Sequence, residues 1–238
     1  MTDEDRASDT HWVRWHQAYR DPTSPLSLRL RLVQSAVRDS LDRAEAGPSH
    51  RPFRIISMCA GQGRDVIDVL AERPRSSPIR VLLVELDPGL VAFARQRAAG
   101  ADLGEAVTVT VLEGDASRVA LYADHVPADL VLVCGVFGNI SDEDIHGVVR
   151  ALPALTAPGA DVIWTRHRRP PDLTPTIRRW FGDAGFTEVS FEGPEGFVLS
   201  VGHHRRRADS PAGSGRPMLL LEPDAKLFEF VGDGLLPA

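Results

Sequence analysis

The stretch Arg54-Ile-Ile-Ser-Met-Cys-Ala-Gly-Gln-Gly-Arg-Asp65 decides the fold of this chain. It joins an apolar run to a glycine-rich turn, and an apolar helical pattern follows the turn. A strand, a tight turn and a helix in this order begin a nucleotide-binding α/β fold. Glycines adopt backbone angles that other residues disfavour, and they let a ligand approach the main chain. The stretch therefore predicts a parallel sheet with a ligand site at the end of its first strand.

A second landmark is an acid at the end of the next apolar run. Glu85 lies 22 residues after Gly63 (85 − 63), close to the roughly 20 residues expected for an acid that binds ribose hydroxyls. The dinucleotide pattern G-x-G-x-x-G is excluded because Val66 stands where the third glycine would be. A P-loop is excluded because Lys226 is the only lysine of the chain.

Four segments in order resemble the motifs of the class I, Rossmann-like S-adenosylmethionine-dependent methyltransferases. They are Cys59-Ala-Gly-Gln-Gly63, Val84-Glu-Leu-Asp-Pro88, Glu113-Gly-Asp-Ala116 and Ala128-Asp-Leu-Val-Leu-Val-Cys-Gly135. The resemblance covers about residues 50 to 205, and the stretches 59–65 and 133–140 also resemble a bacterial branch of the class. It implies a doubly wound α/β fold with a mostly parallel seven-stranded sheet whose last strand is antiparallel. It also implies S-adenosylmethionine as cofactor and S-adenosylhomocysteine as product.

One position departs from the pattern of this class. Cys59 stands where the family usually has an acid that helps to hold the methionine ammonium. Another group must bind the ammonium here, or the methionine end binds differently. Cys59 and Cys134 end strands that should be neighbours, and we interpret them as small buried residues against the cofactor rather than as a redox pair.

The resemblance implies cofactor-binding residues at the carboxyl ends of the strands, where ligands bind in such sheets. Glu85 would accept both ribose hydroxyls, and Leu86 would pack on the adenine. Asp115 would accept from the adenine amine; its alternative role is that of a turn residue. The alternative for Glu85 is a solvated acid at the end of a strand. The full predicted set is Tyr19, Ala60, Gly61, Gln62, Gly63, Glu85, Leu86, Asp115, Ala116, Cys134 and Gly135.

Two residues are candidates for catalysis. Asn139, in the loop after the fourth strand, would orient a substrate amine or hydroxyl, or else bond its own backbone. His167 would be a general base, because an imidazole titrates near neutral pH. Three neighbouring arginines would bind a substrate carboxylate or phosphate, or else form a solvated charge run. They are Arg166, Arg168 and Arg169.

The length and composition predict one α/β domain with additions at both ends. The chain has 238 residues, 43% hydrophobic and 25% charged, enough for one domain with a full core. We divide it into a helical cap or lid at 1–50, the Rossmann-like cofactor-binding domain at 51–207, and a flexible linker with a C-terminal tail at 208–238. In the cap, Trp12, Trp15, His16 and Tyr19 share one helical face, which either covers the sheet or closes over the ligand.

Several classes of function are disfavoured. The net charge of −6 argues against a general nucleic-acid binder. Two cysteines give no disulfide framework, which favours a cytoplasmic location, and we expect no signal peptide, membrane span or metal site. The loop after the fourth strand lacks the Asn-Pro-Pro-Tyr or Asp-Pro-Pro-Tyr signature of nucleobase methylation. The oligomeric state stays open.

These observations predict a methyltransferase that acts on an oxygen, nitrogen or carbon atom of a small metabolite. The first alternative keeps S-adenosylmethionine without methyl transfer, as a regulatory or cyclase-like protein, because the acid missing at Cys59 leaves that open. The second is another Rossmann enzyme that uses a nucleotide sugar or a dinucleotide.

Overall fold

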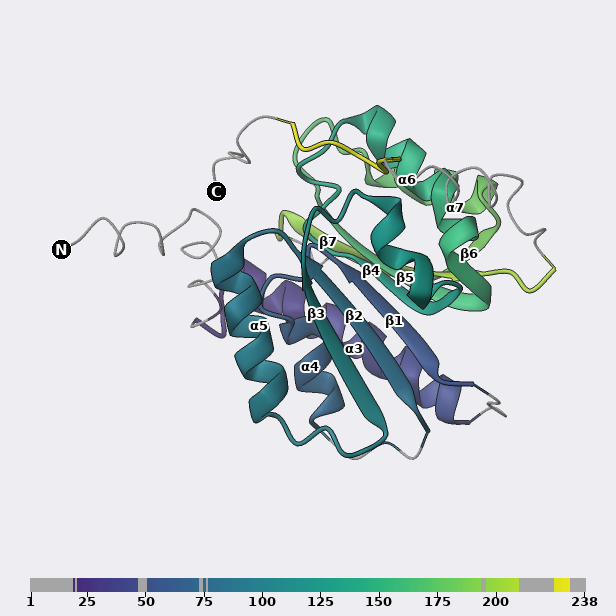
Figure 1. Ribbon diagram of the computed structural model, residues 1–238. Coiled ribbons are helices and arrows are strands. Elements are labelled where there is room, and N and C mark those ends of the chain that lie inside the picture. Colours follow the sequence, from purple (N-terminus) through teal and green to yellow (C-terminus); the bar gives the residue numbers. More distant parts are fainter. Residues whose placement is uncertain are drawn as a thin grey trace.

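The computed structural model describes Tyr19 and residues 21–46, 51–72, 75, 77–193, 196–209 and 225–231. Within these residues a seven-stranded sheet has the order β3-β2-β1-β4-β5-β7-β6 (Figure 1). The strands are β1 (Phe53–Met58), β2 (Ile79–Glu85), β3 (Val107–Glu113), β4 (Ala128–Val133), β5 (Thr156–His167), β6 (Phe186–Glu192) and β7 (Leu199–Arg206). Strands β1 to β5 pair in parallel, and β7 is antiparallel to both of its neighbours. The predicted fold class is confirmed.

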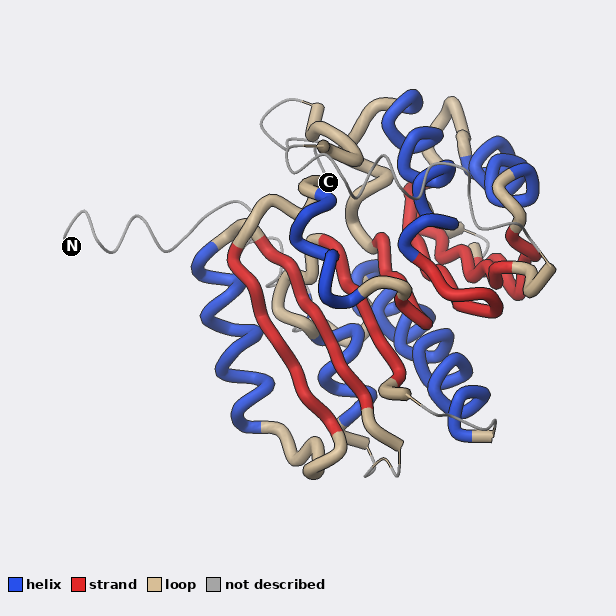
Figure 2. The backbone as a smooth tube through the Cα atoms, turned by 45° about the vertical axis from the view of Figure 1, so that its right-hand side comes forward, coloured by secondary structure: helices blue, strands red, loops and turns tan. Residues whose placement is uncertain are grey.

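Helices cover both faces of the sheet (Figures 1 and 2). The helices are α3 (Pro25–Glu45), α4 (Arg64–Leu70), α5 (Pro88–Gly100), the 3-10 helix η2 (Val119–His125), α6 (Asp142–Leu155) and α7 (Thr174–Asp183). Successive side chains of a strand point to opposite faces. Ile55 therefore packs in the core under α3 and α4, whereas Ile56 packs in the core under α6 and α7. Both cores need apolar strands, which explains the nearly unbroken apolar runs of β2 and β4.

Helix starts follow their sequence signals. The side chain of Asp87 accepts from the backbone N–H of Leu90 at 3.0 Å and caps α5. Ser141 caps α6 in the same way, through the N–H of Asp144 at 3.0 Å. Both are residue types that favour the N-cap position.

Strand β5 is the longest strand of the described sheet. It extends over Thr156–His167 because α6 runs directly into it and β7 pairs with it from Asp161 to His167. The expected helix around residues 10–19 lies outside the described residues apart from Tyr19, as does most of the tail beyond 209. Among the helices in the described ranges, none is long and apolar enough to cross a membrane.

Candidate functional site

The turn after β1 has an unusual backbone. Cys59, Gly61 and Gly63 all have left-handed φ angles, of 51°, 56° and 69°. Cys59 is the only non-glycine residue with a positive φ in the described ranges, and such a residue stores strain. At Gly63 the left-handed φ would strain any other residue, and a Cβ would lie 2.7 Å from a methyl of Ile67, which would have to shift. The N–H groups of Ala60 and Gly61 hold the turn against the carboxyl end of β2.

Glu85 ends β2 and connects this turn to the strand. Its Oε2 accepts from the N–H of Gly61 at 2.7 Å, and its Oε1 accepts from the N–H groups of Leu86 and Asp87 at 2.9 and 3.0 Å. The residue is only 8% exposed. Burial raises the pKa of Glu85, and the three N–H groups oppose that rise. Because a carboxylate has about four acceptor positions, these three bonds leave room for another strong donor.

The neighbouring predicted residues surround Glu85. Leu86 is 63% exposed, so it offers an apolar surface next to the buried acid. Ala60 donates its N–H to the carbonyl of Val84 at 2.9 Å. Gln62 accepts through Oε1 from Nε of Arg64 at 2.8 Å, so its side chain is engaged within the turn.

Asp115 lies in the loop after β3, next to the end of β2. Its Oδ1 accepts from the N–H of Ser117 at 3.0 Å, the geometry of a turn residue, and its Oδ2 lies 3.8 Å from Nζ of Lys226. Ala116 is buried, and its carbonyl accepts from the Tyr122 hydroxyl. The structure thus brings Asp115 and Glu85 to adjacent loops. Burial raises the pKa of the Cys59 thiol, and the negative charges of both carboxylates raise it further.

The loop after β4 is held together by its own hydrogen bonds. Gly135 has a φ of 77°, and its N–H donates to Oγ1 of Thr165 at 2.9 Å. Nδ2 of Asn139 donates to the carbonyl of Gly135 at 2.7 Å. The amide of Asn139 therefore donates a hydrogen bond within its own loop, which is the alternative role predicted for it. A Cβ on Gly135 would meet nothing within 4 Å, so there is open space next to it.

His167, at the end of β5, lies next to this loop. A Cβ on Gly138 would be 3.7 Å from Cδ2 of His167. Burial lowers the pKa of His167, and the charges of Arg166 and Arg169 lower it further. Its buried Nδ1 has no hydrogen-bond partner among the described residues. A neutral imidazole with an unused buried nitrogen can accept a proton from a ligand.

Two of the three neighbouring arginines hold the protein itself. Arg166 donates to the carbonyl of Phe137, and its Nη2 lies 3.5 Å from Oδ1 of Asp142. Arg168 donates to the carbonyl of Gly193 at 2.9 Å. The predicted grip on a substrate carboxylate or phosphate thus gains no support from these contacts. Sequence reasoning missed this role because the partners are mostly backbone carbonyls.

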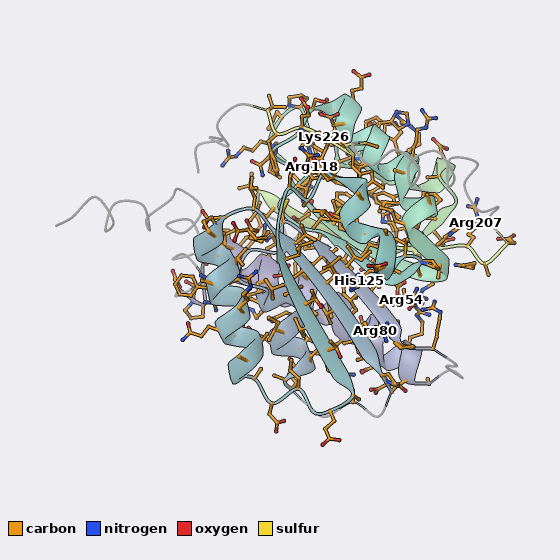
Figure 3. The ribbon with its side chains drawn as sticks, in the orientation of Figure 1. Arg54, Arg80, Arg118, His125, Arg207 and Lys226 are labelled. Carbon is orange, nitrogen blue, oxygen red and sulfur yellow. The ribbon has the colours of Figure 1, made fainter. Side chains whose placement is uncertain are left out.

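The segment 225–231 crosses the loops at the carboxyl end of the sheet. The N–H of Val119 donates to the carbonyl of Ala225 at 3.1 Å, and the N–H of Val231 donates to the carbonyl of Asn139 at 2.9 Å. Leu227 and Phe228 are buried in the core under α6. Figure 1 shows this segment in yellow beside α6, and Figure 3 shows Arg118 and Lys226 next to each other where it crosses. Sequence reasoning had left the role of the tail open.

A second group of charged residues lies on α3 and at the start of α4. The guanidinium of Arg29, on α3, donates to the hydroxyl of Tyr19 at 2.8 Å. Arg29 is 9% exposed. Asp65 lies in the first turn of α4, whose cap position is Gly63. Sequence reasoning missed Arg29, because one arginine in an amphipathic helix carries no signal.

Comparison with protein families identifies the central part of the chain. Residues 57–162 match the family described as "Methyltransferase domain". This range contains the glycine turn, Glu85, Asp115 and the loop after β4. A comparison with curated protein sequences finds no significant match.

Solved structures share the fold at low sequence identity. Magnesium protoporphyrin IX methyltransferase from Synechocystis PCC 6803, with bound S-adenosylhomocysteine, is 16% identical with a TM-score of 0.58, over 85% of this chain and 96% of that one. An O-methyltransferase family protein from Burkholderia thailandensis is 19% identical with a TM-score of 0.54, over 76% of this chain; the match spans 57% of that longer chain. The glycopeptide N-methyltransferase MtfA, in complex with S-adenosylmethionine, is 15% identical with a TM-score of 0.50, over 71% and 93%. Such low identities establish the fold and leave the substrate open. Residues 57–162 thus match a methyltransferase domain, and the sheet order shows that the chain has the Rossmann-like fold of these methyltransferases.

Proposed function

We propose that this protein transfers a methyl group from S-adenosylmethionine to an oxygen, nitrogen or carbon atom of a small molecule. The carboxylate of Glu85 carries the proposal. It is buried at the end of β2, and three backbone N–H groups fix it beside the exposed Leu86. An acid held by neutral donors keeps its charge available for the hydroxyls of a ribose.

The adenosine part of the cofactor would lie across the carboxyl ends of β1, β2 and β3. Glu85 would accept from the ribose, and Leu86 would pack on the adenine. Asp115 would accept from the adenine amine through Oδ2, because Oδ1 already holds the N–H of Ser117. The backbone of Gly61 and the open space beside Gly135 leave room for the ligand between the two loops.

The acceptor molecule would lie between the loop after β4 and His167. When bound, the cofactor supplies an electrophilic methyl group on a sulfonium. The protein would mainly position and desolvate the reactants. His167 would take a proton from an acceptor that needs deprotonation, since its lowered pKa keeps the imidazole neutral. Asn139 would orient the acceptor through its amide oxygen, because its Nδ2 is bonded to Gly135.

Three features support a small acceptor. The segment 225–231 bridges the loops after β3 and β4, so protein covers the sheet end on that side. The chain has a net charge of −6, which repels nucleic acid. Two of the similar structures are named for a porphyrin and a glycopeptide as the molecules that they methylate.

Calorimetric titration of the folded protein with S-adenosylhomocysteine, S-adenosylmethionine and NAD tests the proposal. We expect both sulfur-containing ligands to bind and NAD not to bind. Folded protein that binds neither would overturn the proposal, and binding of NAD alone would favour a dinucleotide enzyme. S-adenosylmethionine bound without turnover across a panel of hydroxyl, amine and carbon acceptors would favour the regulatory alternative.

A further inference from the structure

A cluster of basic residues lies at the end of the sheet opposite to Glu85. Arg54 belongs to β1, Arg80 belongs to β2, and His125 is the last residue of η2. Figure 3 shows the three residues close together at the amino ends of these strands. Arg80 and Glu85 are five positions apart (85 − 80) on β2, which is about 17 Å along a strand. The cluster is therefore separate from the proposed cofactor site.

The pairing of the strands brings the two arginines side by side. Arg54 is the register partner of Arg80, and Arg80 is the register partner of Thr108 on β3. Residues in one such row lie about 4.8 Å apart and point to the same face of the sheet. That face is the one that η2 covers, because Ile56 and Leu82, two positions further along β1 and β2, pack in the core that includes η2. Arg54, Arg80 and Thr108 thus form one polar row across three strands.

His125 meets this row from η2. Nη1 of Arg54 donates to the carbonyl of Val126, the residue after His125, at 3.1 Å. This bond holds the guanidinium of Arg54 against the end of η2. Burial lowers the pKa of His125, and the charges of Arg54 and Arg80 lower it further, while the carboxylate of Asp124 opposes the shift. The imidazole is therefore neutral at pH 7 and can gain a proton when negative charge arrives.

Neither arginine of the row has an acidic partner in the described part of the chain. The guanidinium of Arg54 bonds only a backbone carbonyl there, and Arg80 forms neither a hydrogen bond nor an ion pair with those residues. Asp129 accepts from the backbone N–H of Arg54 at 2.9 Å, but the guanidinium of Arg51 bonds both of its carboxylate oxygens. Nε of Arg54 and Nδ1 of His125 are buried without a hydrogen-bond partner among the described residues. A buried polar atom left unpaired costs free energy, so a ligand that bonds these atoms would be favoured.

The sequence around the row is basic, although the chain as a whole is acidic. Residues 46–53 and 73–79, which lead into β1 and β2, contain no aspartate or glutamate. The net charge of the chain is −6, so the positive charge at this place is local. Like charges on neighbouring strands repel each other and destabilise the sheet. An anion bound between the two guanidinium groups would remove that repulsion.

We propose that Arg54, Arg80 and His125 bind the phosphate group of a small molecule, with the hydroxyl of Thr108 as a further donor. A guanidinium binds two phosphate oxygens with its planar fork. Donors from three different elements suit a tetrahedral anion with three free oxygens better than a planar carboxylate with two. Arg80 and Thr108 are exposed, so the rest of the ligand can extend into solvent. The proposal does not depend on the cofactor.

Calorimetric titration with inorganic phosphate and with glycerol 3-phosphate tests the site. Each is titrated into the parent protein, Arg80→Ala and the control Arg38→Ala. Arg80 is exposed and bonds no described residue, so its removal should leave the fold intact. Arg38 lies on α3 and pairs with Glu72 at 2.6 Å on the surface, and its loss changes the net charge by the same amount.

We expect both phosphate compounds to bind the parent with a Kd of about 1 mM, as two hydrogen bonds to a charged group would give. Arg80→Ala should weaken both about 10-fold, and Arg38→Ala should bind like the parent. Equal affinity in the parent and Arg80→Ala, or no heat of binding in the parent well above 1 mM, would overturn the proposal. Acetate bound as tightly as phosphate would overturn the choice of a phosphate group. Binding of inorganic phosphate without glycerol 3-phosphate would replace the small molecule by the free ion.

Sulfate tests the role of His125, because sulfate itself does not titrate near neutral pH. Its affinity for the parent should rise about two- to fivefold between about pH 8 and pH 5.5, as His125 takes up a proton and adds a positive charge. This rise should be absent in His125→Gln, and an equal rise in that variant would remove His125 from the site. S-adenosylhomocysteine should bind Arg80→Ala as it binds the parent, so a failure of the phosphate site leaves the proposed function untouched.

Discussion

Glu85 and Asp161 are buried carboxylates of the same sheet, but their surroundings differ in kind. Among the residues that the structure describes, Glu85 is held only by backbone N–H groups at the carboxyl end of β2. Asp161, fully buried in β5, lies 2.6 Å from Nη2 of Arg43, 2.8 Å from Nε of Arg205 and 3.3 Å from Nε2 of His203. One acid has neutral donors, and the other has cationic neighbours.

The pKa shifts of the two acids are opposite for this reason. Burial dominates at Glu85 and raises its pKa. At Asp161 burial also raises the pKa. The interactions with His203, Arg205 and Arg43 outweigh burial and hold the pKa well below its ordinary value. A carboxylate whose charge is balanced by neighbouring cations stabilises the fold. A carboxylate without such cations can bind a ligand.

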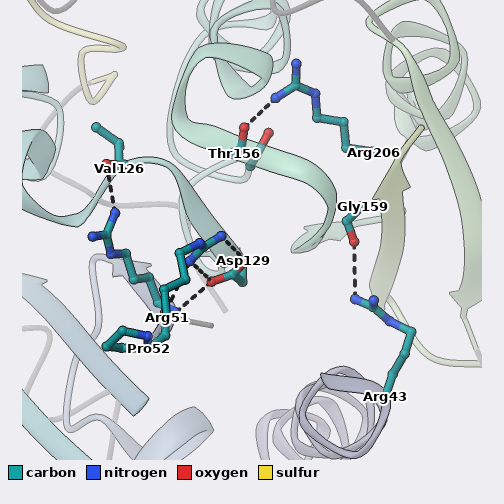
Figure 4. A network of polar contacts seen from close by, with 9 residues as sticks. Arg43, Arg51, Pro52, Val126, Asp129, Thr156, Gly159 and Arg206 are labelled. Carbon is teal, nitrogen blue, oxygen red and sulfur yellow. Dashed lines mark hydrogen bonds and ion pairs between the residues drawn. The ribbon is translucent and has the colours of Figure 1, made fainter. Parts of the chain in front are cut away.

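The two ends of the sheet repeat this contrast. Arginines tie the elements together at the end where the strands begin (Figure 4). Arg51 holds the carboxylate of Asp129 at 2.7 Å, Arg43 donates to the carbonyl of Gly159 at 3.2 Å, and Arg206 donates to the carbonyl of Thr156. In Figure 3, Arg54, Arg80 and His125 also lie together there. At the carboxyl end backbone N–H groups hold Glu85, while Arg166 ties β5 to the loop after β4.

Asp161→Asn should give the largest effect. The substitution leaves Arg43, Arg205 and His203 without their shared carboxylate, and breaking a buried ion pair costs about 3–5 kcal/mol. We expect the free energy of unfolding in urea to fall by that amount, while the folded fraction binds S-adenosylhomocysteine as before. An unchanged unfolding midpoint would break the contrast with Glu85.

Acid should destabilise the protein through His204. Burial lowers the pKa of this histidine to about 4. Between about pH 6.5 and 4, His204 is therefore protonated in the unfolded chain but neutral in the native state. Stability is therefore complete above the ordinary pKa of about 6.5 and decreases as the pH falls towards 4, by at most roughly 3 kcal/mol. Asp161 adds to this loss only below about pH 4, where its unfolded form takes up a proton.

Unfolding curves recorded between pH 7 and 4 measure this loss. In His204→Phe the slope over that range should flatten, because phenylalanine keeps the stacking on Phe181 without titrating. An equally steep slope in the variant would assign the acid sensitivity to another group.

Glu85→Ala should separate binding from stability. We expect S-adenosylhomocysteine affinity to fall about 10- to 100-fold, since a charge-assisted hydrogen bond to the ribose is lost. Stability should change less than in Asp161→Asn, because the lost hydrogen bonds and the relieved desolvation of the carboxylate partly cancel. Calorimetry and thermal unfolding on the same sample measure both; unchanged affinity would remove the ribose assignment.

Lys226→Ala should have the smallest effect. Its Nζ lies 3.8 Å from Asp115 and 3.4 Å from Glu229, and all three side chains are partly or largely exposed. Exposed pairs contribute about 0–1 kcal/mol. We expect the unfolding midpoint to be nearly unchanged, since Leu227 and Phe228 hold the segment by burial. A loss as large as that of Asp161→Asn would mean that ion pairs also hold the carboxyl end together.

The parts of the site that local sequence encodes were predictable. The turn 59–63, the acid Glu85 and the caps Asp87 and Ser141 depend on neighbours a few residues away. Arg166 was not predictable, because it holds the carbonyl of Phe137, and no residue type marks a backbone acceptor. Only the structure could decide whether the side chains of Asp115 and Asn139 form hydrogen bonds within their own loops.

The sequence by itself determined the α/β class and the acid at the end of β2, and its resemblance to the class I methyltransferases implied the seven-stranded sheet. Periodicity, glycine geometry and capping act over short distances, so they can be read along the chain. Only the tertiary structure decided that Gln34 of α3 bonds the start of α4, that 225–231 bridges two loops, and that Asp161 lies between Arg43 and Arg205. Those contacts join residues tens of positions apart, and they form only when packing of the two cores fixes the helices and strands relative to one another.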